Sequence, residues 1–211
     1  MSIYRIAYLM LLVLLVFITI AVVTGMSFPG DTSVSEWINN IQSPFFDALM
    51  PVVSYLGAFP YCIIASLLAG LAFWLFKRRI ESLFIVIVPY IGVSISYILK
   101  FLIERPRPFE DSLQNSFPSG HTIYTSILLG LIIYFIPQVI KNKTWCNAVQ
   151  IFAVLYIILM GFSRIYLQYH WLSDVLASLI IATLVIVPAI ILYKYLMKRE
   201  IECLSFLKSK P

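Results

Sequence analysis

The chain has 211 residues, of which 61% are hydrophobic and only 12% are charged, and this balance excludes an ordinary water-soluble domain. Its apolar residues gather in runs of about twenty, the length that an α-helix needs to cross a bilayer. The net charge is +5, but the Lys and Arg residues flank the apolar runs, so no nucleic-acid partner is expected. We therefore predict an all-α, polytopic membrane helical bundle that forms a single domain over residues 1–211.

The first apolar run begins after Arg5 and could be mistaken for a signal peptide. The run continues to about Val23, which is longer than the apolar region of a usual signal peptide, and no small-x-small cleavage site follows it. We therefore expect an uncleaved first membrane span at residues 4–25.

The segment between the first and second spans is predicted to hold two short helices. Ser33 and Glu36 have the spacing of a capping box, and the apolar residues after Ser33 share one helix face. Residues 33–42 are therefore expected to lie in the membrane interface with this face down. A second apolar piece, residues 44–56, is interpreted either as a packed connector or as a gate for the substrate.

Six membrane spans are expected in all. With boundaries good to a few residues, they cover residues 4–25, 58–76, 80–100, 121–140, 145–165 and 172–196. Cys62 and Cys146 fall within spans and are interpreted as small apolar residues. The three cysteines lack the spacing of a metal site, so no metal or other cofactor is predicted from them.

The distribution of Lys and Arg predicts the orientation of the spans. With the N-terminus inside, eleven basic residues lie on the cytoplasmic side and four on the outer side, as the positive-inside rule requires. We therefore expect a multi-pass protein of the cell membrane with both termini in the cytoplasm. The four outer basic residues break the rule and are candidates for function. They are Lys100, Arg105, Arg107 and Arg164.

The first of three polar motifs is RPRP, which follows the third span. Each proline fixes its own φ and biases the preceding residue away from helix, so a rigid, extended turn is expected to hold Arg107, seven residues after Lys100. The planar guanidinium matches phosphate oxygens. Taken alone, the motif fits arginines that meet lipid headgroups equally well. Arg105 is expected to be a headgroup or structural contact. Its candidate partners are Glu104, Glu110 and Asp111.

The second motif is PSGH, which opens the fourth span. Ser119 suits the N-cap of a helix, and Gly120 allows a ligand to approach the backbone closely. Free N–H groups at a helix N-terminus bind anions, and His121 follows within the first turn. The alternative is an ordinary cap with an interfacial histidine.

The third motif, SRIYLQYHWLSD, joins the fifth span to the sixth. Arg164 lies at the membrane boundary, and His170 and Asp174 share a helix face if the helix has begun by His170. Asp174 then fixes the tautomer of His170 and leaves the other ring nitrogen as a nucleophile. The alternative is a helix cap by Ser173 or Asp174, which explains neither Arg164 nor the pairing.

Together, the motifs supply two histidines, one aspartate and three cations, a set that suits phosphoryl transfer without a metal. In this order, K-x6-RP, PSGH and SR-x5-H-x3-D resemble the type 2 phosphatidic acid phosphatase superfamily. The likeness is greatest to small bacterial integral-membrane lipid phosphatases that act on phosphatidylglycerophosphate or undecaprenyl diphosphate. The latter often carry Asp at the position of Gly120, which favours the glycerophospholipid branch.

The resemblance implies a role for each residue of the motifs. His170 would be the nucleophile that forms a phosphohistidine, Asp174 would orient it, and His121 would protonate the leaving group and then activate water. The implied substrate is a lipid phosphomonoester or diphosphate (phosphatidylglycerophosphate, phosphatidate or undecaprenyl diphosphate), cleaved at the outer face without a cofactor. The implied phosphate-binding residues are Lys100, Arg107, Ser119, Gly120 and Arg164.

Two other functions are weighed against this one. A lipid transporter or flippase would need the arginines to bind a headgroup, but not a His–Asp pair with a second histidine. A phosphatase of a soluble ester, such as a sugar phosphate, would use the same motifs. The motifs carry no information on the oligomeric state.

Overall fold

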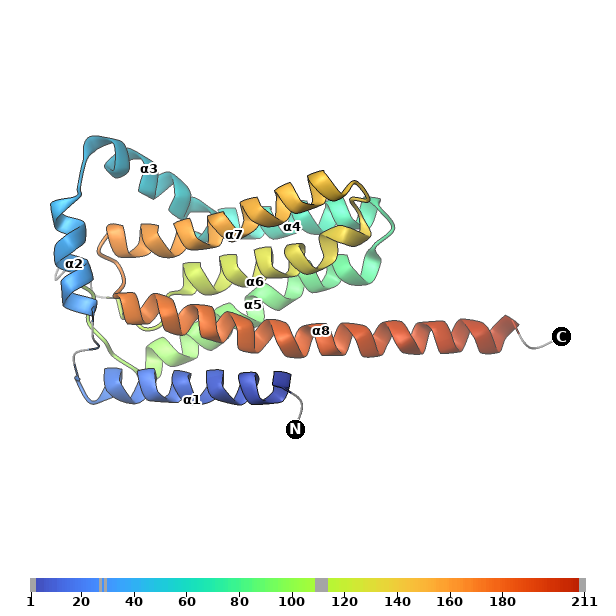
Figure 1. The fold of residues 1–211 in the computed structure, drawn as a ribbon, viewed down its shortest axis with the longest axis horizontal. Helices are drawn as coiled ribbons and strands as arrows, with labels where there is room; N and C mark the ends of the chain where they lie inside the picture. The colour runs from blue at the N-terminus through green and yellow to red at the C-terminus, as the bar shows by residue number, and fades with distance from the viewer. Residues whose placement is uncertain (1–2, 27, 29, 109–113, 209–211) are drawn as a thin grey trace.

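The computed structural model describes residues 3–26, 28, 30–108 and 114–208, and every regular element in these ranges is helical. Most of its helices run side by side as a bundle, and two short helices, α2 (Asp31–Asn40) and α3 (Pro44–Ser54), cover one end of it (Figure 1). The helices that run along the bundle are α1 (Ile3–Val23), α4 (Tyr61–Leu75), α5 (Arg79–Leu102), α6 (Gly120–Phe135), α7 (Lys143–Tyr166) and α8 (Leu172–Lys208). Single 3-10 turns follow α3 (η1, Tyr55–Gly57) and α6 (η2, Ile136–Gln138).

The all-α membrane architecture predicted from the sequence is confirmed, with one difference in the second span. In the described residues, five helices are long and apolar enough to cross a membrane, namely α1, α5, α6 (with η2), α7 and α8. The 15 residues of α4 are only about 22 Å long, which is less than the bilayer core of about 30 Å. Helix α4 meets the α3–η1 segment at a bend of 60°, and this bent pair is the candidate for the sixth span.

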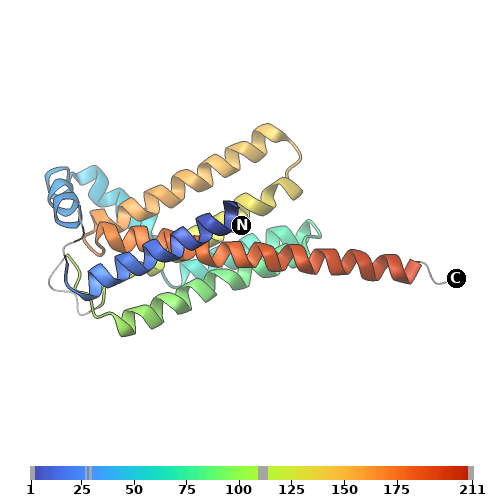
Figure 2. The same ribbon diagram turned by 60° about the horizontal axis from the view of Figure 1, so that its bottom comes forward.

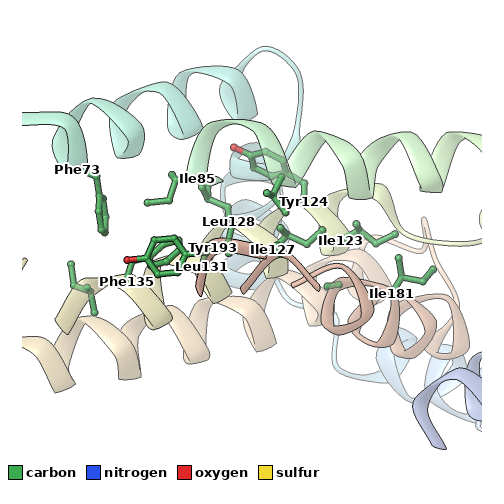
Figure 3. Close-up of a cluster of buried hydrophobic side chains, with 14 of the residues drawn as sticks. Phe73, Ile85, Ile123, Tyr124, Ile127, Leu128, Leu131, Phe135, Ile181 and Tyr193 are labelled. Atoms are coloured by element: carbon green, nitrogen blue, oxygen red, sulfur yellow. The ribbon is translucent and has the colours of Figure 1, made fainter. Parts of the chain in front are cut away.

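Helix α6 is the centre of the bundle and positions the start of the PSGH motif. It packs against α5, α7 and α8 and buries side chains on nearly all of its faces. Its residues Ile123, Ile127 and Leu131 join Phe73 of α4 and Tyr193 of α8 in the main hydrophobic core (Figure 3). Because neighbours surround α6, its N-terminus is held in one place.

Helix α8 is much longer than the predicted sixth span. It contains 37 residues, about 55 Å of helix, and continues past the predicted end at residue 196. Its C-terminal part projects beyond the other helices (Figures 1 and 2).

The capping box predicted at Ser33 is wrong. Gly30 occupies the N-cap with a positive φ of 96°, and this left-handed turn starts α2 at Asp31, two residues before Ser33. The apolar side chains of α2 are divided between the protein and its surface: Ile38 packs in one cluster with Tyr166 of α7 and Val175 of α8, whereas Trp37 is exposed.

The second connecting helix, α3, is a packed element. Its residues Met50 and Val53 are buried, and the hydroxyl of Tyr156 in α7 donates to the carbonyl of Val53 (2.8 Å). These contacts support the packed-connector interpretation of residues 44–56.

Candidate active site

The three polar motifs meet at the end of the bundle where α2 and α3 lie. The C-terminal ends of α5 and α7 and the N-terminal ends of α6 and α8 reach this end together (Figure 1). The ends of α5, α6 and α7, together with His170 in the turn before α8, border a cavity of about 740 Å³, a size typical of small-molecule sites. Six of the predicted site residues line it: Lys100, Arg107, Gly120, His121, Arg164 and His170.

His170 and Asp174 form a buried pair, as predicted, although not on a shared helical turn. Helix α8 begins at Leu172, after His170, and Asp174 Oδ2 lies 3.5 Å from His170 Nδ1. This distance is longer than a hydrogen bond, but such contacts often shorten when a substrate binds. Asp174 Oδ2 also accepts a hydrogen bond from the backbone N–H of Trp171 (3.0 Å), as the third residue of a helix does in a capping box.

The reversal of the chain between α7 and α8 places His170 next to Arg164. Gln168 adopts a positive φ of 54°, and the backbone N–H of His170 donates to the carbonyl of Arg164 (3.2 Å). Helix α2 supports this turn, because Ser35 Oγ donates to the side-chain oxygen of Gln168 (2.6 Å). Residues of α2 therefore contribute to the position of the histidine.

Burial sets the protonation state of His170. Desolvation lowers the pKa of His170 from 6.5 to about 4; Asp174 opposes the shift, and Arg164 and Lys100 add to it. The imidazole is therefore neutral at pH 7. Because Nδ1 lies toward Asp174, Nε2 is the nitrogen left for a reaction partner in the cavity.

Arg107 and Arg164 both lie close to one aromatic ring. The guanidinium carbon of Arg107 lies 5.4 Å from the ring centroid of Tyr169, and that of Arg164 lies 4.8 Å from it. Arg107 also donates to the side chain of Gln114 (2.8 Å), and Arg164 donates to the hydroxyl of Ser54. The Nε groups of both arginines are buried and have no hydrogen-bond partner among the described residues. They are donors suited to phosphate oxygens.

Lys100 is fixed by the loop that returns from the RPRP motif. Its ammonium donates to the carbonyls of Asn115 (2.5 Å) and Ser116 (3.1 Å), and the Asn115 side chain donates back to the Lys100 carbonyl (2.8 Å). Residues 103–107 contain no helix, as the prolines predict. Arg107, in this non-helical stretch, and Lys100, in the last turn of α5, line the same cavity.

Ser119 is the N-cap of α6, as predicted, but it does not line the cavity. Its Oγ accepts from the backbone N–H (3.4 Å) and the hydroxyl (2.9 Å) of Thr122. Its own backbone N–H donates to Ser178 Oγ of α8 (2.8 Å), and its side chain is fully buried. In this structure Ser119 fixes the start of α6, while Gly120 and His121 reach the cavity.

Arg105 is a structural contact, and among the described residues it binds two aspartates that were not predicted as its partners. Its Nη1 lies 2.5 Å from Asp174 Oδ1, and its Nη2 lies 2.6 Å from Asp31 Oδ2. Its guanidinium carbon is 5.5 Å from the ring centroid of Trp171. Of the predicted partners, Glu110 and Asp111 lie outside the described residues.

Asp31 is a residue of this site that sequence reasoning missed. It lies at the start of α2 and is 4% exposed. The distribution of charged residues in the sequence nevertheless indicated that an acidic residue of this segment could take part. Residues 24–60 carry three acidic side chains and no Lys or Arg, so this segment complements the basic motifs on the same side of the protein.

Comparison with known proteins identifies the family. The PAP2 superfamily matches residues 80–198, which contain all three motifs. The chain belongs to the PAP2 superfamily. This PAP2 protein is 28% identical over 157 residues to phosphatidylglycerophosphatase B of Bacillus subtilis (strain 168), covering 71% of this chain and 76% of that one. It is 31% identical over 137 residues to undecaprenyl-diphosphatase BcrC of the same organism, covering 59% and 66% respectively.

Two solved structures share the fold of this PAP2 protein. The crystal structure of a transmembrane PAP2-type phosphatidylglycerolphosphate phosphatase from Bacillus subtilis has a TM-score of 0.73 at 23% identity, over 87% of this chain and 96% of that chain. The structure of LpxE from Aquifex aeolicus has a TM-score of 0.57 at 23% identity, over 80% and 98%. This PAP2 protein is thus a multi-pass membrane protein of the lipid phosphate hydrolase class.

Proposed function

We propose that this PAP2 protein removes a phosphate group from a lipid by way of a phosphohistidine on His170. One observation carries the proposal. A neutral His170, with Asp174 behind it, shares a cavity with Arg107 and Arg164, whose buried Nε groups have no partner among the described residues. This arrangement combines a nucleophile with cations for the charged oxygens of a transferring phosphoryl group.

In the first step, His170 Nε2 attacks phosphorus. The N–P bond forms as the bond to the leaving oxygen breaks, and His121 delivers a proton to that oxygen. The imidazole ring gains positive charge in this step, and the carboxylate of Asp174 next to Nδ1 stabilises it. The guanidinium groups and the Gly120 N–H at the start of α6 stabilise the equatorial oxygens.

In the second step, water takes the place of the leaving group, which is a lipid alcohol for a phosphomonoester and a lipid monophosphate for a diphosphate. His121, now neutral, accepts a proton from the water as the water oxygen attacks phosphorus. The N–P bond breaks, inorganic phosphate leaves, and His170 returns to its neutral form. The positive charge for both steps comes from Lys100, Arg107 and Arg164, so the proposal requires no metal ion.

The shape of the cavity favours a lipid substrate. From Lys100 and Arg107 the cavity extends along α5 to Tyr90, ten residues or about 15 Å from Lys100. Its rim includes Phe59, Tyr97 and Phe101, which are 80%, 71% and 82% exposed. Exposed aromatic side chains in the lining suit contact with lipid. The basic side chains of the same cavity are then available to the phosphate group.

Phosphate release by purified protein tests the mechanism. With phosphatidylglycerophosphate in detergent micelles and EDTA present, the wild type is expected to release phosphate, and His170→Ala is expected to be slower by at least about 10³-fold. Labelled phosphate from the substrate should be trapped on His170 after rapid quenching, which a transporter without chemistry would never show. Activity that survives in His170→Ala, or that EDTA abolishes, contradicts the mechanism.

A substrate panel tests the lipid assignment. We propose phosphatidylglycerophosphate or undecaprenyl diphosphate as substrate, because relatives with those names match the chain, and phosphatidate as a third candidate. Glycerol 3-phosphate represents the soluble esters. Faster hydrolysis of glycerol 3-phosphate than of every lipid would contradict the assignment.

We further propose that the site faces the outside of the cell and that both termini are cytoplasmic. The support is the excess of Lys and Arg at the opposite end of the bundle. In a cysteine-free background, Glu36→Cys should react with an impermeant thiol reagent in intact cells, and Lys143→Cys should react only after lysis. Both positions are exposed, so the reverse pattern would overturn the orientation.

A further inference from the structure

A continuous chain of polar contacts leads from the nucleophile to the start of α2. His170 faces Asp174, Asp174 contacts Arg105, and Arg105 contacts Asp31. The side chains of Asp174 and Asp31 are 0% and 4% exposed, and that of Arg105 is 13% exposed. The single guanidinium thus binds two buried carboxylates, one from α8 and one from α2.

Asp31 also caps α8 from another part of the chain. Its Oδ1 accepts from the backbone N–H of Ser173 (2.8 Å), and its Oδ2 accepts from the hydroxyl of Ser173 (2.7 Å). Backbone N–H groups in the first turn of a helix lack partners within the helix, so an acceptor placed there fixes the helix start. This is the turn of α8 that carries Asp174.

We propose that Asp31 and Arg105 are positioning residues for the nucleophile, and that they act on His170 through Asp174. Arg105 binds Asp174 Oδ1 and leaves Oδ2 on the side of His170 Nδ1. Asp31 binds the other terminal nitrogen of Arg105 and so keeps Arg105 on a single oxygen of Asp174. This inference rests on the proposed function, in which Asp174 stabilises the positive charge that His170 gains.

The charges explain why two carboxylates are needed. Arg105 paired with Asp174 alone would be neutral, and little negative charge would remain for the ring of His170. With Asp31 included, the three side chains carry one net negative charge. If Asp31 loses its charge, Arg105 is free to bind both oxygens of Asp174 in the forked geometry that arginine favours, and Oδ2 turns away from His170.

The first experiment compares Asp31→Asn, Arg105→Gln and the double variant in phosphate release from phosphatidylglycerophosphate, phosphatidate and undecaprenyl diphosphate. Because the charge on His170 develops during the reaction, Asp31→Asn should lower kcat on the order of 10-fold, as loss of an outer partner typically does, with KM nearly unchanged. The double variant should be less impaired than the product of the two single effects, because Asp31 matters chiefly when Arg105 is present.

Glu81→Gln is the matched control. Glu81 is also a buried carboxylate, 3% exposed, but it lies near the other end of the bundle, where it accepts from the hydroxyl of Tyr193 (2.9 Å). Its replacement should lower the unfolding temperature and leave kcat unchanged. A loss of kcat in Asp31→Asn no larger than in Glu81→Gln, or single effects that simply multiply, would overturn the proposal.

A second readout does not depend on activity. The chain has two histidines, so ¹⁵N spectra of histidine-labelled protein contain two rings, which His121→Gln assigns. The wild type should show His170 protonated at Nδ1, and Asp31→Asn should show a loss of this preference. An unchanged His170 signal would contradict the inference. If the wild type hydrolyses none of the three lipids, the proposed function fails, and the spectra still decide the role of Asp31.

Discussion

Gly57 lies directly against His121: a Cβ atom placed on Gly57 would be 2.9 Å from the Cα atom of His121 and 2.8 Å from its Cβ atom. Carbon atoms that are not bonded do not approach this closely, so either η1 or the first turn of α6 would have to move. The surrounding helices hold α6, and His121 lines the cavity. The absence of a side chain at residue 57 therefore permits the observed position of the proposed proton donor.

Gly57→Ala should lower kcat/KM on the order of 10²-fold, because a displacement of about 1 Å at a reacting group has this effect. Gly130→Ala is the control, since its Cβ would meet only the end of the Ile186 side chain, Cδ1 at 2.6 Å. Initial rates of phosphate release measure both. Equal rates for the two variants would mean that His121 tolerates the shift.

Ser54 is predicted to support substrate binding through Arg164. It is buried and accepts a hydrogen bond from the guanidinium of Arg164. Because a hydrogen bond to a charged group contributes about 1.5–3 kcal/mol, Ser54→Ala should raise KM roughly 10-fold or more by loosening Arg164. Ser82→Ala, which removes an equally buried hydroxyl bonded to the Gly70 carbonyl, should leave KM unchanged. Equal KM values in both variants would count against this role.

The buried, neutral His170 predicts that the protein loses stability in acid. In the unfolded chain His170 binds a proton near pH 6.5, whereas in the folded protein it does so only near pH 4. Between these values the unfolded state binds more protons, so stability is fully present above about pH 6.5 and falls as the pH drops toward 4.

The expected contribution is up to about 3 kcal/mol. It is measured as the difference in unfolding temperature between wild type and His170→Ala from pH 4.5 to 7.5. The unfolding temperature of the wild type, relative to that of His170→Ala, should be lowest at pH 4.5. A difference independent of pH would show that His170 titrates normally.

The hydrogen bond between Tyr193 and Glu81 is predicted to matter for stability alone. Both side chains are buried, and Tyr193 packs in the aromatic cluster around Phe135. Tyr193→Phe leaves the carboxylate without its hydroxyl donor, at a cost of about 1–3 kcal/mol. Thermal unfolding should show the loss, and kcat should not change. A fall in kcat in protein that remains folded would indicate coupling between the two ends of the bundle.

Sequence reasoning located the parts of the site that depend on local spacing. His170 and Asp174 are four residues apart, and RPRP and PSGH fix the backbone within a few residues. Such rules depend on dihedral preferences and caps, which neighbours along the chain determine. Five of the six predicted spans were also found among the described residues, because apolar runs must match the bilayer thickness; the second is a bent pair of shorter helices.

The contacts of Asp31 could not be predicted in the same way. Its partners Arg105 and Ser173 are 74 and 142 residues away, and only the packing of α2 against α8 brings them together. The capping box at Ser33 failed for a related reason. The pattern of Ser33 and Glu36 was present, but a left-handed turn at Gly30 began the helix at Asp31. The side chain of Asp31 caps α8 instead of its own helix.

The aromatic rim of the cavity, formed by Phe59, Tyr97 and Phe101, has a consequence for kinetics. A protein that collects its substrate through a lipid-facing edge meets it by diffusion in two dimensions. The concentration that matters is then the mole fraction of substrate in the membrane, not its amount per volume of solution. Diluting the substrate with an inert phospholipid should slow the reaction even when the total substrate in the sample is constant.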